Sequence, residues 1–176
     1  MKKTLIIISI VLLSILSIYL LYLAITAKEK YFNKVTIDTE NTIVNGTKEK
    51  YLDTIVYAGL KSLNLKNLNV VILPMSTNNT EAGIEFDAYV VEFSGSYYIY
   101  IRDYSRQKSI DVLSHELIHV SQYRNKNLII KNDMLVLWND SIYDGHIIAY
   151  ENRPWEIDAF DRQSFLATKI RTILYE

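Results

Sequence analysis

The N-terminal part of the chain carries one long apolar run. Residues 4–27 include no charged side chain and are mostly Leu, Ile, Val, Ala, Ser and Tyr, and the paired lysines Lys2 and Lys3 precede them. An α-helix rises about 1.5 Å per residue, so this run extends over roughly 36 Å and covers a bilayer interior of about 30 Å. We therefore predict a transmembrane helix in residues 1–27.

A cleaved signal peptide is the alternative interpretation of the same run. Signal peptides have a shorter apolar region of about 7–15 residues, followed by a small-x-small cleavage site. The only exit sequence here is Ile25-Thr26-Ala27, which fits such a site poorly. Lysines before the run place the short N-terminus inside, so the rest of the chain is expected to face away from the cytoplasm. It would be secreted if the segment were cleaved.

Beyond a polar stretch at residues 28–46, which we interpret as a stalk, apolar residues return with helical spacing. The spacing predicts one helix over residues 52–63 and a second that opens at Ser109 and runs to about residue 123. Asp111 then falls in the first turn of the second helix. Pro154 is typical of a first helical position and predicts a last helix to about residue 174.

Shorter apolar or alternating runs predict strands, at residues 70–73, 84–90, 97–101 and 134–138. The second and third of these flank a Ser-Gly-Ser turn and form a predicted hairpin, whereas residues 139–150 read as irregular. A helix, a small antiparallel sheet, a helix, an irregular link and a final helix together indicate an α+β domain. We assign this domain to residues 47–176.

Composition narrows the functional classes. The chain has 176 residues and no Cys, which excludes disulfides, thiolate metal sites and cysteine nucleophiles. Residues 28–176 carry 17 basic and 20 acidic side chains. A mildly acidic domain binds phosphate backbones poorly, so no nucleic-acid partner is expected.

Residues 115–119 read H-E-L-I-H, and this motif carries the chemistry. Spacing of i, i+4 on a helix places His115 and His119 on one face, where both imidazoles can bind one zinc ion. Glu116 follows His115 in sequence but lies off the helix face that carries the two histidines, where it can take a proton from a water that the zinc activates. A helical wheel separates both histidines from the apolar stripe of the helix, so they are not incidental members of the core face. A solvated polar face of the helix stays open as the alternative interpretation.

A catalytic zinc usually has three protein ligands and one open position. The metzincin class is excluded because Asn125 stands where that class requires a histidine. On the last helix, Glu156 shares a face with Ala159 and Gln163, which predicts that it points inward, whereas Asp158 points mostly outward. We select Glu156 as third ligand. The other downstream candidates stay open: Asp140, Asp144, His146, Glu151 and Asp158.

The motif at 115–119, followed by R-P-W-E-I-D-A at 153–159, resembles the gluzincin zinc metallopeptidases, with the compact members closest in size. In that family a second helix carries the glutamate that completes the zinc site. The resemblance covers roughly residues 97–163. It implies that both histidines of the first motif and Glu156 bind Zn²⁺, that Glu116 is the general base, and that the first motif lies on a zincin-type active-site helix.

The sequence therefore predicts a membrane-anchored zinc metalloendopeptidase acting on a peptide or protein substrate. Glu116 would take a proton from the attacking water and return it to the leaving amine. The developing oxyanion needs a donor, and the side chains considered for this role are Tyr143, His146, Tyr150 and Arg153. We select His146 as a further catalytic candidate because a rare residue sits in an irregular link. The strand at 97–101 is predicted to be an edge that pairs with extended substrate.

Two other functions stay open. The domain could be a non-catalytic or degenerate zincin-fold module that binds a partner at the membrane. It could also be a zinc hydrolase that acts on another bond, such as a cell-wall amide. Because all four positions of the catalytic set are intact, we favour the peptidase.

Overall fold

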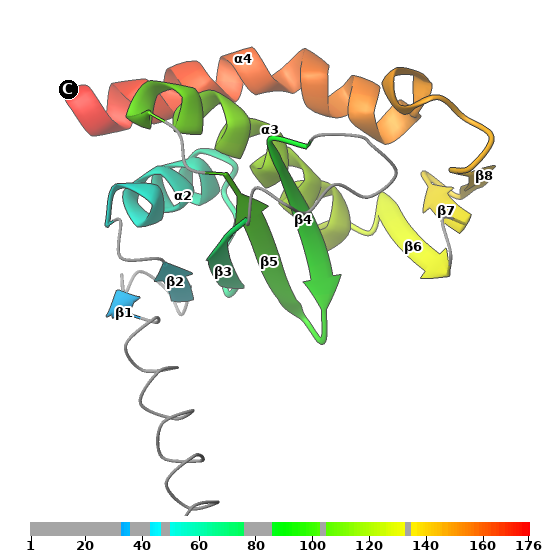
Figure 1. The fold of residues 1–176 in the computed structure, drawn as a ribbon, viewed down its shortest axis with the longest axis horizontal. Coiled ribbons are helices and arrows are strands. Elements are labelled where there is room, and N and C mark those ends of the chain that lie inside the picture. The colour runs from blue at the N-terminus through cyan, green and yellow to red at the C-terminus, as the bar shows by residue number, and fades with distance from the viewer. Residues whose placement is uncertain (1–32, 36–42, 47–49, 76–85, 103–104, 133–134) are drawn as a thin grey trace, which may run out of the picture. The chain divides into compact units, whose positions relative to one another are not determined.

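The computed structural model describes residues 33–35, 43–46, 50–75, 86–102, 105–132 and 135–176 (Figure 1). Apart from Asn33, these residues belong to one unit, Lys34–Glu176. The predicted membrane segment, residues 1–27, lies outside the described residues. Within the described ranges, no helix has the length and apolarity needed to cross a bilayer.

The domain is α+β, as predicted, but its main sheet is mixed rather than antiparallel. Its five strands have the order β1-β2-β3-β5-β4. Their bounds are β1 Asn33–Val35, β2 Ile43–Gly46, β3 Asn69–Pro74, β4 Ala88–Phe93 and β5 Ser96–Ile101. Strand β3 pairs in parallel with both β2 and β5, and the β4–β5 hairpin is antiparallel.

Connection length explains this correction. A tight turn at Ser94-Gly95 joins β4 to β5 and gives the predicted hairpin, with Gly95 at φ +75°. Helix α2 (Lys50–Ser62) joins β2 to β3, and such a crossover makes the two strands parallel. Residues 33–35 and 43–46, which we placed in the stalk, are therefore strands of the sheet, and the Val44 side chain is fully buried.

A second sheet has three antiparallel strands in the order β6-β7-β8. They are β6 Leu128–Asn132, β7 Leu135–Trp138 and β8 Ser141–Asp144. Only β7 was predicted; β6 was missed, and β8 occupies part of the link that we expected to be irregular. A two-residue turn joins β7 to β8, with Asn139 and Asp140 both at positive φ.

Three helices cover one face of the main sheet. Helix α4 (Pro154–Tyr175) lies across α2 and α3 (Arg106–Arg124), as Figure 1 shows. The predicted start of α3 at Ser109 is wrong, because the Ser105 side chain caps the helix by accepting from the Lys108 N–H. Residues 106–108 are exposed and polar, so they gave no apolar signal. Asp111 consequently lies beyond the first turn, where it pairs with Arg171 at 2.6 Å.

The core stripe of α3 is the one that the helical wheel predicted. Its members are fully buried, and they are Ile110, Leu113, Leu117 and Val120. Helix α2 approaches α3 closely at Gly59, where an added Cβ would overlap the Cδ1 atom of Leu117 and lie 3.1 Å from Ile170. The small residue lets α2, α3 and α4 pack together, which fixes the position of the helix that carries the histidines.

Helix α2 also carries a buried acidic side chain, Asp53. Asp53 of α2 is 1% exposed, and neither carboxylate oxygen has a hydrogen-bond partner within the described part of the chain. Burial raises the pKa of Asp53 from 3.8 to about 6. Between these values the folded chain retains a proton that the unfolded chain has released. The free energy of unfolding therefore falls as pH rises through this window.

Asp53→Asn should remove this pH dependence. A shift of about two pKa units corresponds to about 3 kcal/mol, so wild type should lose about that much stability relative to the variant between pH 3.8 and pH 7. Denaturant unfolding at both pH values, with chelator present, measures the difference. Asp161→Asn, at an exposed position of α4, is the control and should keep the wild-type dependence. Parallel curves for wild type and Asp53→Asn would contradict the prediction.

Candidate metal centre

Helix α3 is buried on its polar face as well as on its apolar face. His115, Glu116, His119 and Gln122 are between 2% and 7% exposed. This excludes the alternative that the histidines belong to a solvated surface. Buried polar groups need partners, and α4, which packs along this face, supplies them.

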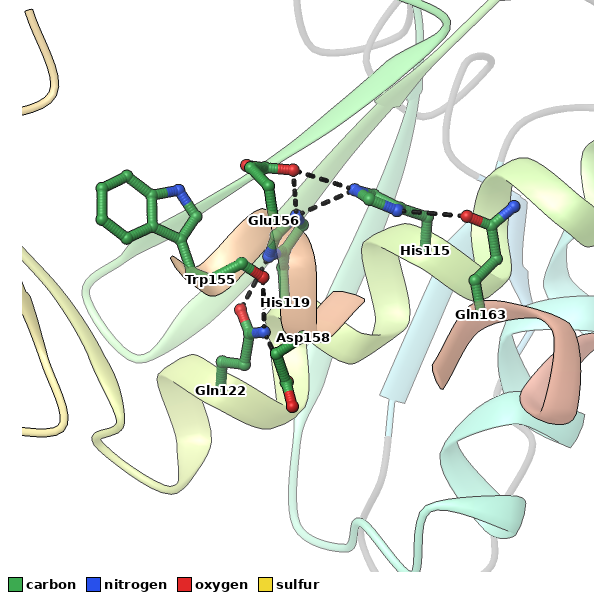
Figure 2. Close-up of polar contacts among 7 residues, drawn as sticks. All are labelled: His115, His119, Gln122, Trp155, Glu156, Asp158 and Gln163. Carbon is green, nitrogen blue, oxygen red and sulfur yellow. Dashed lines mark hydrogen bonds and ion pairs between the residues drawn. The ribbon is translucent and has the colours of Figure 1, made fainter. Parts of the chain in front are cut away.

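Three ligand atoms converge between the two helices (Figure 2). The Nε2 atoms of His115 and His119 are 3.1 Å apart, and they lie 3.1 Å and 3.3 Å from Oε2 of Glu156. Ligand atoms held about 2.0–2.1 Å from one tetrahedral ion lie about 3.3 Å from each other. The observed separations fit a single ion placed among the three atoms, and all three residues are buried.

Glu156 reaches this point because of the way α4 begins. Pro154 starts the helix, so Glu156 lies in its first turn. Ala159, one turn further on, is fully buried and lets α4 pack closely on α3. The prediction that Glu156 points inward is confirmed. The prediction that Asp158 points mostly outward is wrong, because it is half-buried and accepts a hydrogen bond from Gln122.

Gln122 fixes the tautomer of His119. Its amide nitrogen donates to the Trp155 carbonyl at 2.9 Å and to the Asp158 carboxylate at 2.8 Å, so its oxygen must face the imidazole (Figure 2). Nδ1–H of His119 therefore donates to Gln122 Oε1 at 2.7 Å. With the ring proton held on Nδ1, the lone pair on Nε2 is left for a cation.

Gln163 makes the corresponding contact on the other ring. Its Oε1 lies 3.2 Å from Nδ1 of His115. With this proton arrangement on both rings, two imidazole lone pairs and one carboxylate oxygen face one another at close range. Three acceptors in that arrangement repel unless a metal ion or a proton lies between them. The site is thus organised around a positive charge.

The pKa shifts agree with a negative carboxylate among imidazoles. Burial alone would raise the pKa of Glu156, but when protons rather than a metal ion lie between the three groups, hydrogen bonds from His115 and His119 hold this pKa well below its usual range. Burial alone would lower the pKa of His119, but the hydrogen bond to Glu156 and the charge of Glu116 raise it. Glu116 has a raised pKa chiefly because it is buried, with Glu156 adding repulsion.

Tyr150 adds a hydroxyl group to the site, from the short helix η1 (Tyr150–Asn152). The pKa of Tyr150 is raised by burial first and by the negative charge of Glu156 second, so the phenol and this carboxylate act on each other. Sequence reasoning named Tyr150 among four possible donors but could not separate it from the other tyrosines.

Other predicted site residues lie elsewhere. His146 is exposed, and its backbone N–H donates to Asp144 at 2.9 Å; its proposed catalytic role stays a prediction. Among the described residues, one group has the geometry to hold an ion, and it comprises His115, His119 and Glu156. The alternative third ligands, Asp140, Asp144, Glu151 and Asp158, do not belong to it.

Gln122→Leu should weaken metal binding. The change removes the acceptor that orients His119 and fixes its tautomer, and loss of such an outer partner typically costs about 10–100-fold in metal affinity. Competition with a chromophoric chelator measures the dissociation constant. Gln163→Leu is the comparison: its side chain is half-buried, so water can replace it, and the loss should be smaller. Equal affinity of Gln122→Leu and wild type would contradict the role of Gln122.

Comparison with known proteins finds no match for this chain among protein-family models, curated proteins or solved structures. The chemistry of the site therefore has to be inferred from its own residues. Two neutral imidazoles and one carboxylate form a donor set suited to a divalent transition metal such as zinc. A second buried carboxylate, that of Glu116, lies within electrostatic reach of all three ligands.

Proposed function

We propose that this chain is a membrane-anchored zinc metalloendopeptidase of gluzincin type. The observation that carries the proposal is the convergence of His115, His119 and Glu156 within about 3.3 Å of one another, on two helices far apart in the sequence. The proposed anchor is the apolar run at residues 4–27. Because Lys2 and Lys3 precede this run and favour a short N-terminus inside, the catalytic domain is proposed to lie on the outer side of the membrane.

Zinc suits this donor set better than the harder divalent cations. Imidazole nitrogen and a single carboxylate oxygen are frequent zinc ligands, whereas Mg²⁺ and Ca²⁺ prefer shells made of oxygen alone. Three protein ligands also leave one coordination position free, which is the pattern of catalytic rather than structural zinc. When bound, the ion supplies a Lewis acid that activates water and polarises a carbonyl oxygen.

Glu116 is the proposed general base. It follows the first ligand directly on α3, is 5% exposed, and feels the charges of both histidines and of Glu156. Its carboxylate takes a proton from the attacking water and delivers that proton to the leaving amine nitrogen. The Tyr150 hydroxyl is the proposed donor to the substrate oxygen, since it lies within the electrostatic influence of Glu156.

The substrate is proposed to be an extended peptide. The predicted edge strand at 97–101 is wrong, because β5 lies between β3 and β4. Strand β4 is the edge of the sheet in the described part of the chain, and it packs against α3. A strand at the edge of a sheet is where an extended peptide can add by main-chain hydrogen bonds. A peptide paired with β4 would therefore run alongside the helix that carries the metal ligands.

The experiment that tests this function is peptide hydrolysis by the full chain in detergent. Protein stripped with chelator and reloaded with one equivalent of Zn²⁺ should cut an unfolded protein such as casein, and mass spectrometry should find new internal termini. Chelator should abolish the cleavage and Zn²⁺ should restore it. If zinc-loaded protein cleaves neither casein nor a mixed peptide library, the peptidase proposal fails and the partner-binding module becomes the better interpretation.

A further inference from the structure

A row of aromatic rings begins at the metal site and extends away from it. The Phe160 ring lies 4.6 Å from the His115 ring, measured between centroids. Tyr150 lies 6.5 Å from Phe160, and Phe86 lies 6.0 Å from Tyr150, both in edge-to-face geometry. The rings come from α3, α4, η1 and the segment before β4, so four separate parts of the chain meet here.

The middle of this row is held rigidly. The Arg153 guanidinium stacks over the Tyr150 ring, 5.5 Å from its centroid. The same guanidinium donates to the carbonyls of Gly145 and Ile148, at 2.8 Å and 3.4 Å. Arg153 thus ties the link before η1 to the start of α4. These contacts hold the guanidinium in place over the Tyr150 ring.

Phe160 is the exposed member of the row. Its side chain is 52% exposed although it contacts a buried metal ligand. An aromatic ring left half in water beside a polar site gains free energy when another apolar group covers it. The nearby guanidinium of Arg153 also disfavours a cationic group at the same place.

We propose that Phe160, Tyr150 and Phe86 form the subsite for an apolar side chain, aromatic by preference, next to the scissile bond. This rests on the proposed function and names its substrate class: peptides with an aromatic or large aliphatic residue flanking the bond. Two features support that occupant. The rings are continuous with the metal ligands, and β4, the strand proposed to align the peptide, begins two residues after Phe86.

Small metal-binding probes test the subsite without needing turnover. N-acetyl-phenylalanine hydroxamate and N-acetyl-glycine hydroxamate share one chelating group and differ only in the benzyl side chain. Their affinities for the cobalt-substituted full chain are measured from the visible spectrum of Co²⁺. Burial of the benzyl group should make the phenylalanine compound roughly 10- to 100-fold tighter.

Phe160→Ala should reduce this ratio by about 5- to 10-fold, the range expected for loss of an aromatic pair. Affinity for the glycine compound should stay within about twofold, because the chelating group does not need the ring. Phe160→Leu should restore part of the ratio. Phe165→Ala is the matched control, since Phe165 is another exposed phenylalanine of α4, 65% exposed and stacked with Lys169, and it should keep the full ratio.

The outcomes separate the two proposals. Equal affinities for both compounds in wild type, or tighter binding of N-acetyl-lysine hydroxamate, would overturn the aromatic subsite and leave the metal site intact. An unchanged ratio in Phe160→Ala would also overturn it. If neither compound binds the cobalt-loaded protein, the bound metal has no open coordination position, and the proposed peptidase function fails together with the subsite.

Discussion

Replacing Glu116 by glutamine should abolish hydrolysis while the metal stays bound. The amide has nearly the shape of the carboxylate but cannot take a proton, and loss of a general base costs about 10²- to 10⁴-fold in kcat. The change leaves the proposed metal ligands His115, His119 and Glu156 in place. Peptide hydrolysis gives the rate, and metal analysis of the purified variant gives the zinc content.

The matched control for this change is Glu151→Gln. Glu151 is an exposed acid of η1, close in sequence to the ligand helix. Its replacement should leave both hydrolysis and zinc content at wild-type values. A Glu116→Gln variant that retains hydrolysis within tenfold of wild type would contradict the proposed base. If the variant loses zinc as well, Glu116 is acting in the metal site and not as a base.

The second large effect concerns Glu156. Glu156→Ala removes the only carboxylate oxygen among the three converging atoms and leaves the two Nε2 atoms 3.1 Å apart with no anion beside them. Loss of a residue that only hydrogen-bonds a metal ligand typically lowers metal affinity by up to about 100-fold. Because Glu156 is itself a proposed ligand, we expect its loss to lower zinc affinity by more than that. Hydrolysis should be lost at metal concentrations that saturate wild type.

Glu151→Ala separates this effect from a general loss of negative charge. Glu151 was an open alternative for the third ligand, but it lies outside the converging group. Its variant should bind zinc as wild type does, in the same chelator competition. Thermal unfolding without metal shows whether Glu156→Ala still folds. Unchanged zinc affinity in a folded Glu156→Ala variant would show that another residue completes the site.

The core of the site could be predicted from sequence because helical spacing is strict. A separation of four residues puts His115 and His119 on one face in any helix, and the spacing of Ala159 and Gln163 indicated the inward face of α4. The partners of the histidines could not be predicted in the same way. Gln122 acts by contacting Trp155 and Asp158 on another helix, and such contacts depend on packing.

The errors in the fold have similar causes. Strand β2 contributes only two apolar residues, Ile43 and Val44, within a polar stretch, so its pattern was too short to detect. Periodicity also does not report which strands pair, so the parallel order around β3 was missed. The β7–β8 turn did carry a signal: Asn139-Asp140 suits the two positive φ values of a tight hairpin.

Zinc K-edge X-ray absorption of the full chain, loaded with one equivalent of Zn²⁺, tests the central claim most directly. We predict one zinc per chain with two imidazole nitrogens at about 2.0–2.1 Å and oxygen ligands completing the shell. The scattering from imidazole rings in the zinc spectrum should halve in His119→Ala. A spectrum without histidine scattering, or one that His119→Ala leaves unchanged, would contradict the proposed site.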